Sequence, residues 1–286
     1  MKKIILAFLF STTILTSYSQ TSISELNINP IKVDYLGGPT VIIEIEGVRF
    51  MTDPTLDKQG STYQMTPTIQ LEKTGNPYLE KFPPIDYVLL SHDSHQDNLD
   101  TKGRTLLKNV KKVFTSKSAS ENLKNNSVGL KPWESETIVI SKKLEITITA
   151  TPARHGPAGF TKFTGNVIGF IISVKKNNKE YQIYFTGDTV YYEGIKEVSD
   201  RFNPQYIIAC AGAVKAMGLL YITMNENDLV DTSFAFPEAT IIPVHFEGWA
   251  HFSGTISPAK KVFEILGISD KLMILDKENT NHLIIK

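Results

Sequence analysis

The sequence predicts an α/β protein in which helices cover two β-sheets, and two observations support this class. Short runs rich in β-branched and aromatic residues recur through the 286-residue chain, and most are closed by Gly, Pro, Asp or Ser. Fewer segments carry helical signals, and these lie between the β-type runs. Sheets of this kind bury their apolar faces under helices. The β-type runs are 40–47, 48–54, 86–91, 112–116, 137–141, 144–152, 167–174, 181–187, 206–210 and 240–245.

Start and stop signals mark the helical segments. In one, Thr223 and Glu226 have the spacing of a capping box. In another, Ser257 is expected to cap the helix, Pro258 suits the first helical position and Gly267 suits the end. Helices are therefore expected at 99–110, 118–126, 223–236 and 257–267.

The N-terminus has the three-part pattern of a secretory signal peptide. Lys2 and Lys3 precede an apolar run at 4–10, and small and polar residues follow it. A membrane anchor is the competing interpretation, but this run is well short of the roughly 20 apolar residues that a spanning helix needs. We therefore predict a signal peptide at 1–19, export to the periplasm or the medium, and one mature domain at 20–286 with no membrane span.

Charge and cysteine content argue against a nucleic-acid partner and against a catalytic cysteine. The chain has 30 basic and 30 acidic residues, and loss of Lys2 and Lys3 with the signal peptide leaves 28 basic against 30 acidic, a net charge of −2. This balance indicates no nucleic-acid partner and leaves a small molecule as the expected substrate. The single cysteine, Cys210, lies in the apolar run "YIIACAGA" and is expected to be a small buried residue.

Potential metal ligands follow four of the predicted strands directly. His92 and His95 come after "DYVLL", His155 after "LEITITATP", Asp188 after "YQIYFTG" and His245 after "TIIPV". Ligands and catalytic groups gather where strands end, because the strand fixes their position and the loop exposes them. Imidazole nitrogens and carboxylate oxygens suit zinc, manganese or iron. The pattern therefore predicts one metal site built from all four strand ends.

These motifs resemble those of the metallo-β-lactamase-fold hydrolases, and the resemblance covers nearly the whole mature chain. The family signature is H-x-H-x-D-H after a strand, followed by a histidine, a bridging aspartate and a final histidine after later strands. The segments "GGPTVIIEIEGVRFMTDP", "TPARHGP", "YFTGDT" and "IPVHFEGWAHF" are similar to the surrounding family motifs. The chain is most similar to the lactonase and phosphodiesterase-like branch.

The resemblance implies a four-layer αβ/βα sandwich and a metal-dependent hydrolase that acts on an ester, lactone or phosphodiester. It also implies that one or two divalent metal ions, zinc first, are held by His95, Asp97, His155, Asp188 and His245. Asp188 would bridge two ions if both are present. The competing hypothesis is a metal-stabilised binding or scaffold protein of the same fold whose site does not hydrolyse.

The first motif departs from the family pattern in two places. The family has one residue between its first two histidines, whereas two residues separate His92 from His95, so either His92 or Asp93 is the first ligand. Imidazole is the better match to a borderline metal, which favours His92. Asn98 stands where the family has a histidine and is a weaker possible ligand. His251 either replaces that missing imidazole or lines the substrate pocket.

Roles outside the metal set follow from the same resemblance and from residue chemistry. Asp97 is expected to orient the attacking water and to return a proton, with His251 as a further catalytic candidate. Arg154 is a candidate for binding an anionic substrate group, and Trp249 for lining the pocket. Asp100 is either a partner of a ligating imidazole or the cap of the helix that follows it.

Overall fold

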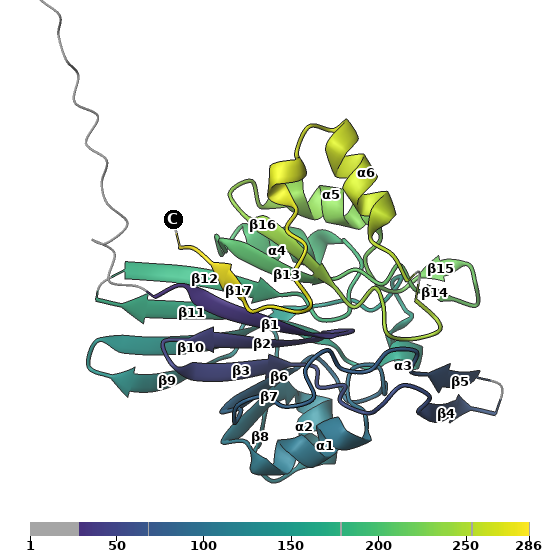
Figure 1. Ribbon diagram of the computed structural model, residues 1–286, viewed down its shortest axis with the longest axis horizontal. Helices are drawn as coiled ribbons and strands as arrows, with labels where there is room; N and C mark the ends of the chain where they lie inside the picture. The colour runs from purple at the N-terminus through teal and green to yellow at the C-terminus, as the bar shows by residue number, and fades with distance from the viewer. Residues whose placement is uncertain (1–28, 68, 178, 253, 286) are drawn as a thin grey trace, which may run out of the picture.

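The computed structural model describes residues 29–67, 69–177, 179–252 and 254–285, so the predicted signal peptide lies outside the described residues. Two β-sheets face each other, and each has helices on its outer face (Figure 1). This arrangement confirms the predicted α/β class and the αβ/βα sandwich. None of the helices within the described ranges has the length and apolarity needed to cross a membrane.

The first sheet has seven strands in the order β17-β1-β2-β3-β6-β7-β8. β3, β6, β7 and β8 run parallel to one another, whereas β17, β1, β2 and β3 pair antiparallel. The bounds are β1 Ile31–Gly37, β2 Thr40–Ile45, β3 Val48–Thr52, β6 Tyr87–Leu90, β7 Lys112–Ser116, β8 Ser127–Leu130 and β17 Asn281–Leu283.

The second sheet has six strands in the order β16-β13-β12-β11-β10-β9. β12, β13 and β16 are parallel, and β9 to β12 form an antiparallel meander. The bounds are β9 Ser135–Ser141, β10 Leu144–Pro152, β11 Ile168–Lys176, β12 Lys179–Phe185, β13 Tyr206–Cys210 and β16 Thr240–Val244.

Three apolar clusters hold the four layers together. The largest lies between the sheets and takes side chains from both, including Phe50, Phe114 and Phe170. A second joins the six-stranded sheet to α4, α5 and α6, and a third lies between the seven-stranded sheet and the segment of α1. The helices are α1 Thr101–Leu106, α2 Lys117–Leu123, α4 Glu193–Ser199, α5 Glu226–Ala235 and α6 Ser257–Ile265, with short 3-10 turns at Leu107–Asn109 and Ser269–Lys271.

Three short elements gather at one end of the sandwich. Two hairpins, β4–β5 and β14–β15, project from this end, and α3 lies beside them (Figure 1). The hairpins are built from β4 Thr62–Thr66 with β5 Ile69–Glu72, and from β14 Lys215–Ala216 with β15 Leu220–Tyr221; α3 spans Thr161–Thr164.

The helix signals predicted α1, α2, α5 and α6 but missed α3 and α4, and they misplaced two caps. Asn225, not Thr223, caps α5 and forms the capping box with Asp228, because its side chain reaches the free N–H groups of the first turn. Ser257 is the first residue of α6 rather than its cap, and its own N–H is bound by the hydroxyl of Thr255. These four helices were therefore expected at the right places, with starts displaced by no more than three residues.

Candidate metal centre

Five of the six histidines of the chain gather at the end of the sandwich where the hairpins project. His92 and His95 follow β6, His155 follows β10, and His245 and His251 follow β16. The sixth, His282, lies on β17 with an exposed side chain. A buried cluster of imidazoles at strand ends is poor packing material, because each ring carries two nitrogens that need partners.

His92, His95 and His155 form what we call the imidazole cluster, and all three are buried. The Nδ1 atom of His95 lies 3.2 Å from Nε2 of His92 and 3.3 Å from Nε2 of His155. The ligand atoms of the three rings all lie within 4.8 Å of one another. Three imidazole nitrogens from two loops thus face one common centre.

The partners of the outer ring nitrogens fix which inner nitrogens lack a proton. Nδ1 of His155 lies 2.6 Å from the carbonyl oxygen of Ile222 and must donate to it. The hydroxyl of Ser91 donates to an ionised Asp53 at 2.6 Å. Because that proton is already used, Nδ1 of His92, which lies 2.9 Å from Oγ of Ser91, donates to this oxygen. Both Nε2 atoms then present lone pairs to the centre.

That count leaves the imidazole cluster with surplus acceptors. A neutral His95 ring has one N–H and can satisfy at most one of the two lone pairs that face its Nδ1 atom. Burial, together with the neighbouring imidazoles, holds the pKa of His92 well below its usual range and lowers that of His95 to about 4, which favours the neutral form of these two rings. Buried, neutral and converging imidazoles are the donor set that zinc and similar cations take.

Asp188 and His245 form a second group beside the imidazole cluster. One carboxylate oxygen of Asp188 lies 2.9 Å from Nδ1 of His245, and the other lies 3.7 Å from Nε2 of His155. Nε2 of His245 faces the carbonyl oxygen of Asp97 at 3.1 Å and donates to it. Asp188 therefore lies between the two groups, as a carboxylate that bridges two ions would.

Electrostatics makes this pair an imidazolium and a carboxylate when no cation is bound. Burial opposes both charges, but the attraction of Asp188 outweighs it and raises the pKa of His245. In the same way, His245 and His155 outweigh burial and hold the pKa of Asp188 well below its usual range. A cation that replaced the His245 proton would meet the same two ligand atoms.

Two buried oxygens beside the clusters also fit a cation. Oδ1 of Asp97 and Oδ1 of Asn98 accept no hydrogen bond from any described residue. The Nδ2 group of Asn98 donates to Asp53 at 2.9 Å, which turns its carbonyl oxygen away from that carboxylate. Unpaired buried acceptors are rare and costly, so the residues present suit a bound metal.

Backbone geometry brings the loops of the two groups together. Gly187 has a φ of +59°, and a Cβ at this position would lie 2.6 Å from the carbonyl oxygen of Ile168 and 2.8 Å from Cβ of Ser91. Only glycine allows the loop of Asp188 to approach the loop of His92 so closely. His245 also has a positive φ of 63°, a strained conformation that often marks functional sites.

Asp93, the alternative first ligand, lies outside the imidazole cluster. Its carboxylate accepts a hydrogen bond from Asn122 at 3.1 Å, and its carbonyl accepts one from Arg104 at 2.8 Å. The extra residue in the motif turns Asp93 toward α2 and leaves His92 facing the centre. Of the two alternatives, the geometry favours His92.

Two predicted substrate-binding residues do not line the cavity above the centre. The guanidinium of Arg154 lies 4.4 Å from the ring centroid of Tyr192, on which it stacks. Trp249 is buried, and its ring centroid lies 6.3 Å from that of His251 and 5.8 Å from that of Tyr63. Neither side chain is among the residues that line this cavity, so the geometry gives no support to their predicted substrate contacts, which stay predictions.

The structure distinguishes between the alternative roles of His251 and Asp100. His251 lines the cavity, and its Nε2 atom lies 2.9 Å from Oδ2 of Asp97. Asp100 caps α1 by accepting from the N–H of Gly103, and its other oxygen meets Lys73, not an imidazole. The helix-cap alternative for Asp100 is therefore the one that the structure has.

Sequence reasoning missed three participants. Asp53 accepts hydrogen bonds from Ser91 and Asn98, and burial raises its pKa to about 7 despite these bonds. Cys210 lies with its sulfur within 4.8 Å of ligand atoms of Asp188 and His245. The "TDP" turn was a signal for Asp53, whereas nothing local in the sequence places Ser91 or Cys210 beside the centre.

Comparison with known proteins agrees with this geometry. The family model described as a beta-lactamase superfamily domain matches residues 48–246. A UPF0173 metal-dependent hydrolase of Carboxydothermus hydrogenoformans is 23% identical over 252 residues, which is 85% of this chain and 96% of that protein. The N-acyl-phosphatidylethanolamine-hydrolyzing phospholipase D 1 of Caenorhabditis elegans is 26% identical over 184 residues, which is 59% of this chain and 50% of that protein.

A solved structure shows the same fold. The isothiocyanate hydrolase from Delia radicum gut bacteria superposes with a TM-score of 0.70 at 22% identity, over 87% of this chain and 98% of that one. The family match spans more than half of the chain and includes every strand end that carries the imidazole cluster, Asp188 and His245. The chain therefore belongs to the beta-lactamase superfamily and is a metal-dependent hydrolase of the metallo-β-lactamase fold.

Proposed function

We propose that this protein is an exported hydrolase that uses one or two divalent metal ions, zinc first, to cleave an ester, lactone or phosphodiester in a small molecule. The observation that carries the proposal is the convergence of lone pairs from His92, His95 and His155 on one centre, with Asp188 beside it. A purely structural cluster would have paired these nitrogens with donors.

The residues divide into two sets of ligands. The imidazole cluster would hold one ion, and Asp188 with His245 would hold a second, completed by Asp97 or by the weaker oxygen of Asn98. A bound divalent metal lowers the pKa of water and polarises the oxygen of the bond being broken.

The protein itself supplies orientation and a proton route. Oδ1 of Asp97 is free to accept a hydrogen bond from water, while Oδ2 is held by Nε2 of His251 at 2.9 Å. His251 faces the cavity and is half-buried, so it can pass a proton between Asp97 and a leaving group. The hydrogen bond from His251 and the surrounding histidines outweigh burial and lower the pKa of Asp97, which keeps it ionised.

Two kinds of support bear on the bond that is cleaved. Similarity to the C. elegans phospholipase D supports a phosphodiester. The resemblance of the motifs to the lactonase-like branch supports an ester or lactone. These bonds need the same groups, namely an activated water and a polarised oxygen, so the site accommodates each of them.

The test is metal content and turnover measured together on the purified mature protein. Elemental analysis should find one or two equivalents of metal, and a panel of aryl esters, γ-lactones and bis(p-nitrophenyl) phosphate should include a substrate whose hydrolysis stops with chelator. His155→Ala should lose both properties, while His282→Ala, which changes the one histidine outside the site, should keep both. Bound metal without any turnover would favour the binding or scaffold protein instead.

Export has a separate test. Residues 1–20 fused to a reporter should carry it across the inner membrane, with cleavage near Ser19. The matched control replaces Lys2 and Lys3 with glutamate, which should weaken export. A reporter that stays in the cytoplasm in both fusions would contradict this part of the proposal.

A further inference from the structure

One cavity of about 460 Å³ opens directly above the metal centre. Its floor contains side chains of both ligand groups and of the proposed proton route, namely His95, His155, Asp188, Asp97 and His251. A substrate whose reacting bond meets this floor must place its remaining atoms against the walls. The walls therefore report the chemistry of the substrate beyond the bond that is cleaved.

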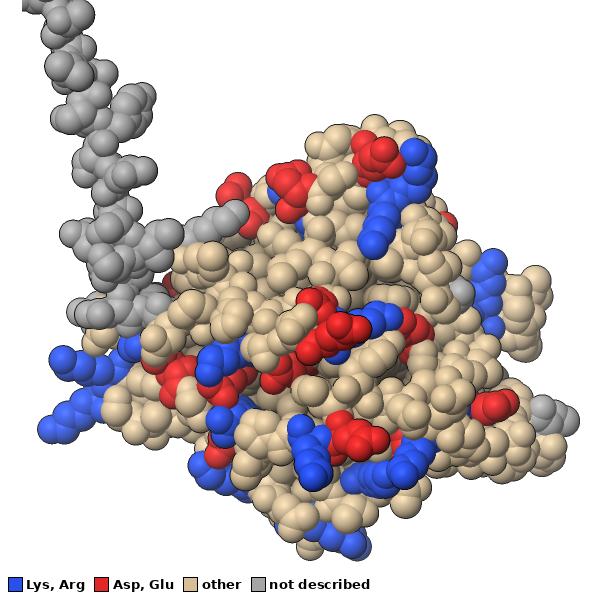
Figure 2. Space-filling model, viewed as in Figure 1, with Lys and Arg blue, Asp and Glu red and all other residues tan. Residues whose placement is uncertain are grey.

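The walls come from the three elements that project at this end of the sandwich. Ile69 of the β4–β5 hairpin, Phe163 of α3 and Met217 of the β14–β15 hairpin line the cavity while 50%, 66% and 76% of their surfaces are exposed. Exposed large apolar side chains on separate elements are expensive in water, and their convergence on one opening marks a binding surface. Figure 2 shows both hairpins as projections at the right that carry few charged side chains.

Charge is nearly absent from these walls. Among the described residues that line the cavity above its histidine and aspartate floor, Lys215 is the one charged side chain. Its ammonium group lies 4.5 Å from the ring centroid of Tyr221, which offers it a cation–π partner. The walls thus hold no acid and no cluster of basic groups that would pair with a highly charged substrate.

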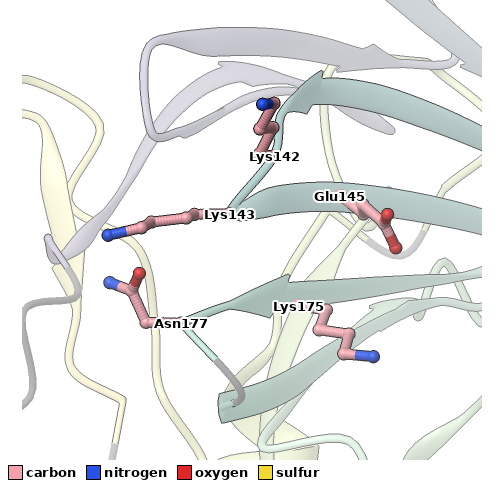
Figure 3. Close-up of a pocket in the computed structure, with 5 residues that line it drawn as sticks. All are labelled: Lys142, Lys143, Glu145, Lys175 and Asn177. Atoms are coloured by element: carbon pink, nitrogen blue, oxygen red, sulfur yellow. The ribbon is translucent and has the colours of Figure 1, made fainter.

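Basic groups gather elsewhere, at the opposite end of the six-stranded sheet. Lys142, Lys143 and Lys175 border a hollow with Glu145 and Asn177, where β10 begins and β11 ends (Figure 3). β10 carries this hollow at its start and leads to His155 after its last residue, so a strand of nine residues separates the two places. Surface lysines alone do not define a site, and this hollow contributes nothing to the metal centre.

We propose that the substrate carries an uncharged apolar group, such as an alkyl or acyl chain, which packs between Ile69, Phe163 and Met217 while the reacting bond meets the floor. This inference rests on the proposed function for the reacting bond alone, because the apolar walls are observed independently of the chemistry. It selects among esters, lactones and phosphodiesters those with an apolar substituent beside the bond.

Chain length is the first readout. With p-nitrophenyl esters from acetate to hexanoate, kcat/KM should rise about two- to fourfold for each added methylene that the walls bury. Met217→Lys and Phe163→Lys should lower the ratio of hexanoate to acetate turnover at least tenfold. Leu219→Lys is the matched control, because Leu219 lies on the same hairpin, is 77% exposed and does not line the cavity.

Binding of a neutral fluorophore, N-phenyl-1-naphthylamine, is the second readout and needs no turnover. We expect one saturable site on the metal-loaded protein, weakened at least fivefold by Met217→Lys but not by Leu219→Lys. Saturable binding with no hydrolysis of any substrate would leave this inference standing and sink the proposed function. Hydrolysis that is independent of chain length, or equal loss in Leu219→Lys, would overturn the inference.

A lipid surface is the alternative occupant of the exposed rim. Sedimentation of the protein with neutral phosphatidylcholine vesicles, abolished by Phe163→Lys and Met217→Lys, would assign the rim to a bilayer and overturn the substrate assignment. We expect the protein to stay in the supernatant, because Ile69, Phe163 and Met217 all line the cavity above the metal centre.

Discussion

Two buried polar clusters of this molecule differ in how completely their groups are paired. In the first, which we call the Lys73 cluster, the buried ammonium of Lys73 meets Asp100 at 3.3 Å and the carbonyl oxygen of Thr55 at 2.6 Å. The other is the imidazole cluster with Asp188 and His245. Both are nearly inaccessible to water, so the difference between them is one of hydrogen bonding.

In the Lys73 cluster, both carboxylate oxygens of Asp100 accept hydrogen bonds. Asp100 accepts from the N–H of Gly103 with one oxygen, and from the N–H of Asp57 and from Lys73 with the other. The metal centre instead contains lone pairs that face each other, and the unpaired oxygens of Asp97 and Asn98. A paired cluster fastens loops together, whereas an unpaired one fits a cation.

The largest expected effect is loss of metal from the unpaired cluster. Asp188→Ala should remove most bound metal and all measurable turnover, because both groups of ligands contact this carboxylate. Thermal unfolding of the metal-free variant should occur at a lower temperature than that of the metal-free parent, because the buried His245 loses its carboxylate partner. Elemental analysis measures the bound metal, and calorimetry measures thermal unfolding. Full metal content in Asp188→Ala would contradict the role of Asp188 as a metal ligand.

Metal affinity also tests whether His92 or Asp93 is the first ligand of the motif, and we expect an effect nearly as large. His92→Ala should weaken metal affinity at least as much as His95→Ala, because its Nε2 atom faces the common centre. Asp93→Asn should change affinity by no more than a few-fold, since this carboxylate contacts Asn122 instead. Competition with a chromophoric chelator measures both, and the reverse ranking would make Asp93 the ligand.

The Lys73 cluster should show the opposite behaviour. Asp100→Ala leaves a buried ammonium without its charge partner and removes the cap of α1, which should cost about 3–5 kcal/mol of unfolding free energy. Metal content per folded chain should be unchanged, because Asp100 contacts no ligand. Urea unfolding with elemental analysis of the folded fraction tests the contrast, and Glu136→Ala at an exposed ion pair is a control with little expected effect.

If two ions are bound, acid should remove them in a fixed order. A raised pKa means that the proton competes at higher pH, so the ion at Asp188 and His245 should leave first as the pH falls. The lowered pKa values of His92 and His95 mean that the imidazole cluster should hold its ion to lower pH. Metal content after dialysis from pH 8 to pH 4 should therefore fall in two steps, and loss of the ion at the imidazole cluster first would contradict this order.

The sequence predicted most of the central strands because they carry their own signals, although β1 and β8 of the seven-stranded sheet were not among the predicted runs. The runs 112–116, 144–152 and 206–210 coincide with β7, β10 and β13 to the residue, since buried strands of β-branched residues end at clear breakers. The strands β4, β5, β14 and β15 were missed, because these short exposed hairpins are held by contacts with the rest of the chain and carry little alternation.

Ligand types at strand ends could be read from the sequence, but the contacts between loops could not. The positions of His155 and His245 followed from the strands that precede them. The stacking of Arg154 on Tyr192 and the burial of Trp249 depend on packing between segments distant in sequence, so no local pattern separates them from cavity residues. The apolar walls were missed for the same reason, because they belong to the unpredicted hairpins and to the unpredicted helix α3.

Cys210 offers the smallest and finest test of the comparison, because its thiol lies beside Asp188 and His245 but also belongs to the apolar core between the sheets. Burial, followed by the nearby carboxylate of Asp188, raises the pKa of the thiol well above its usual range, so it stays a neutral and weak ligand. Cys210→Ala should therefore keep the metal content of the parent and cost only about 1 kcal/mol of unfolding free energy from lost packing. The absorption spectrum of the cobalt-substituted protein gives the sharper measurement. A thiolate-to-cobalt charge-transfer band that disappears in Cys210→Ala would show that Cys210 is a metal ligand and not only a residue of the apolar core.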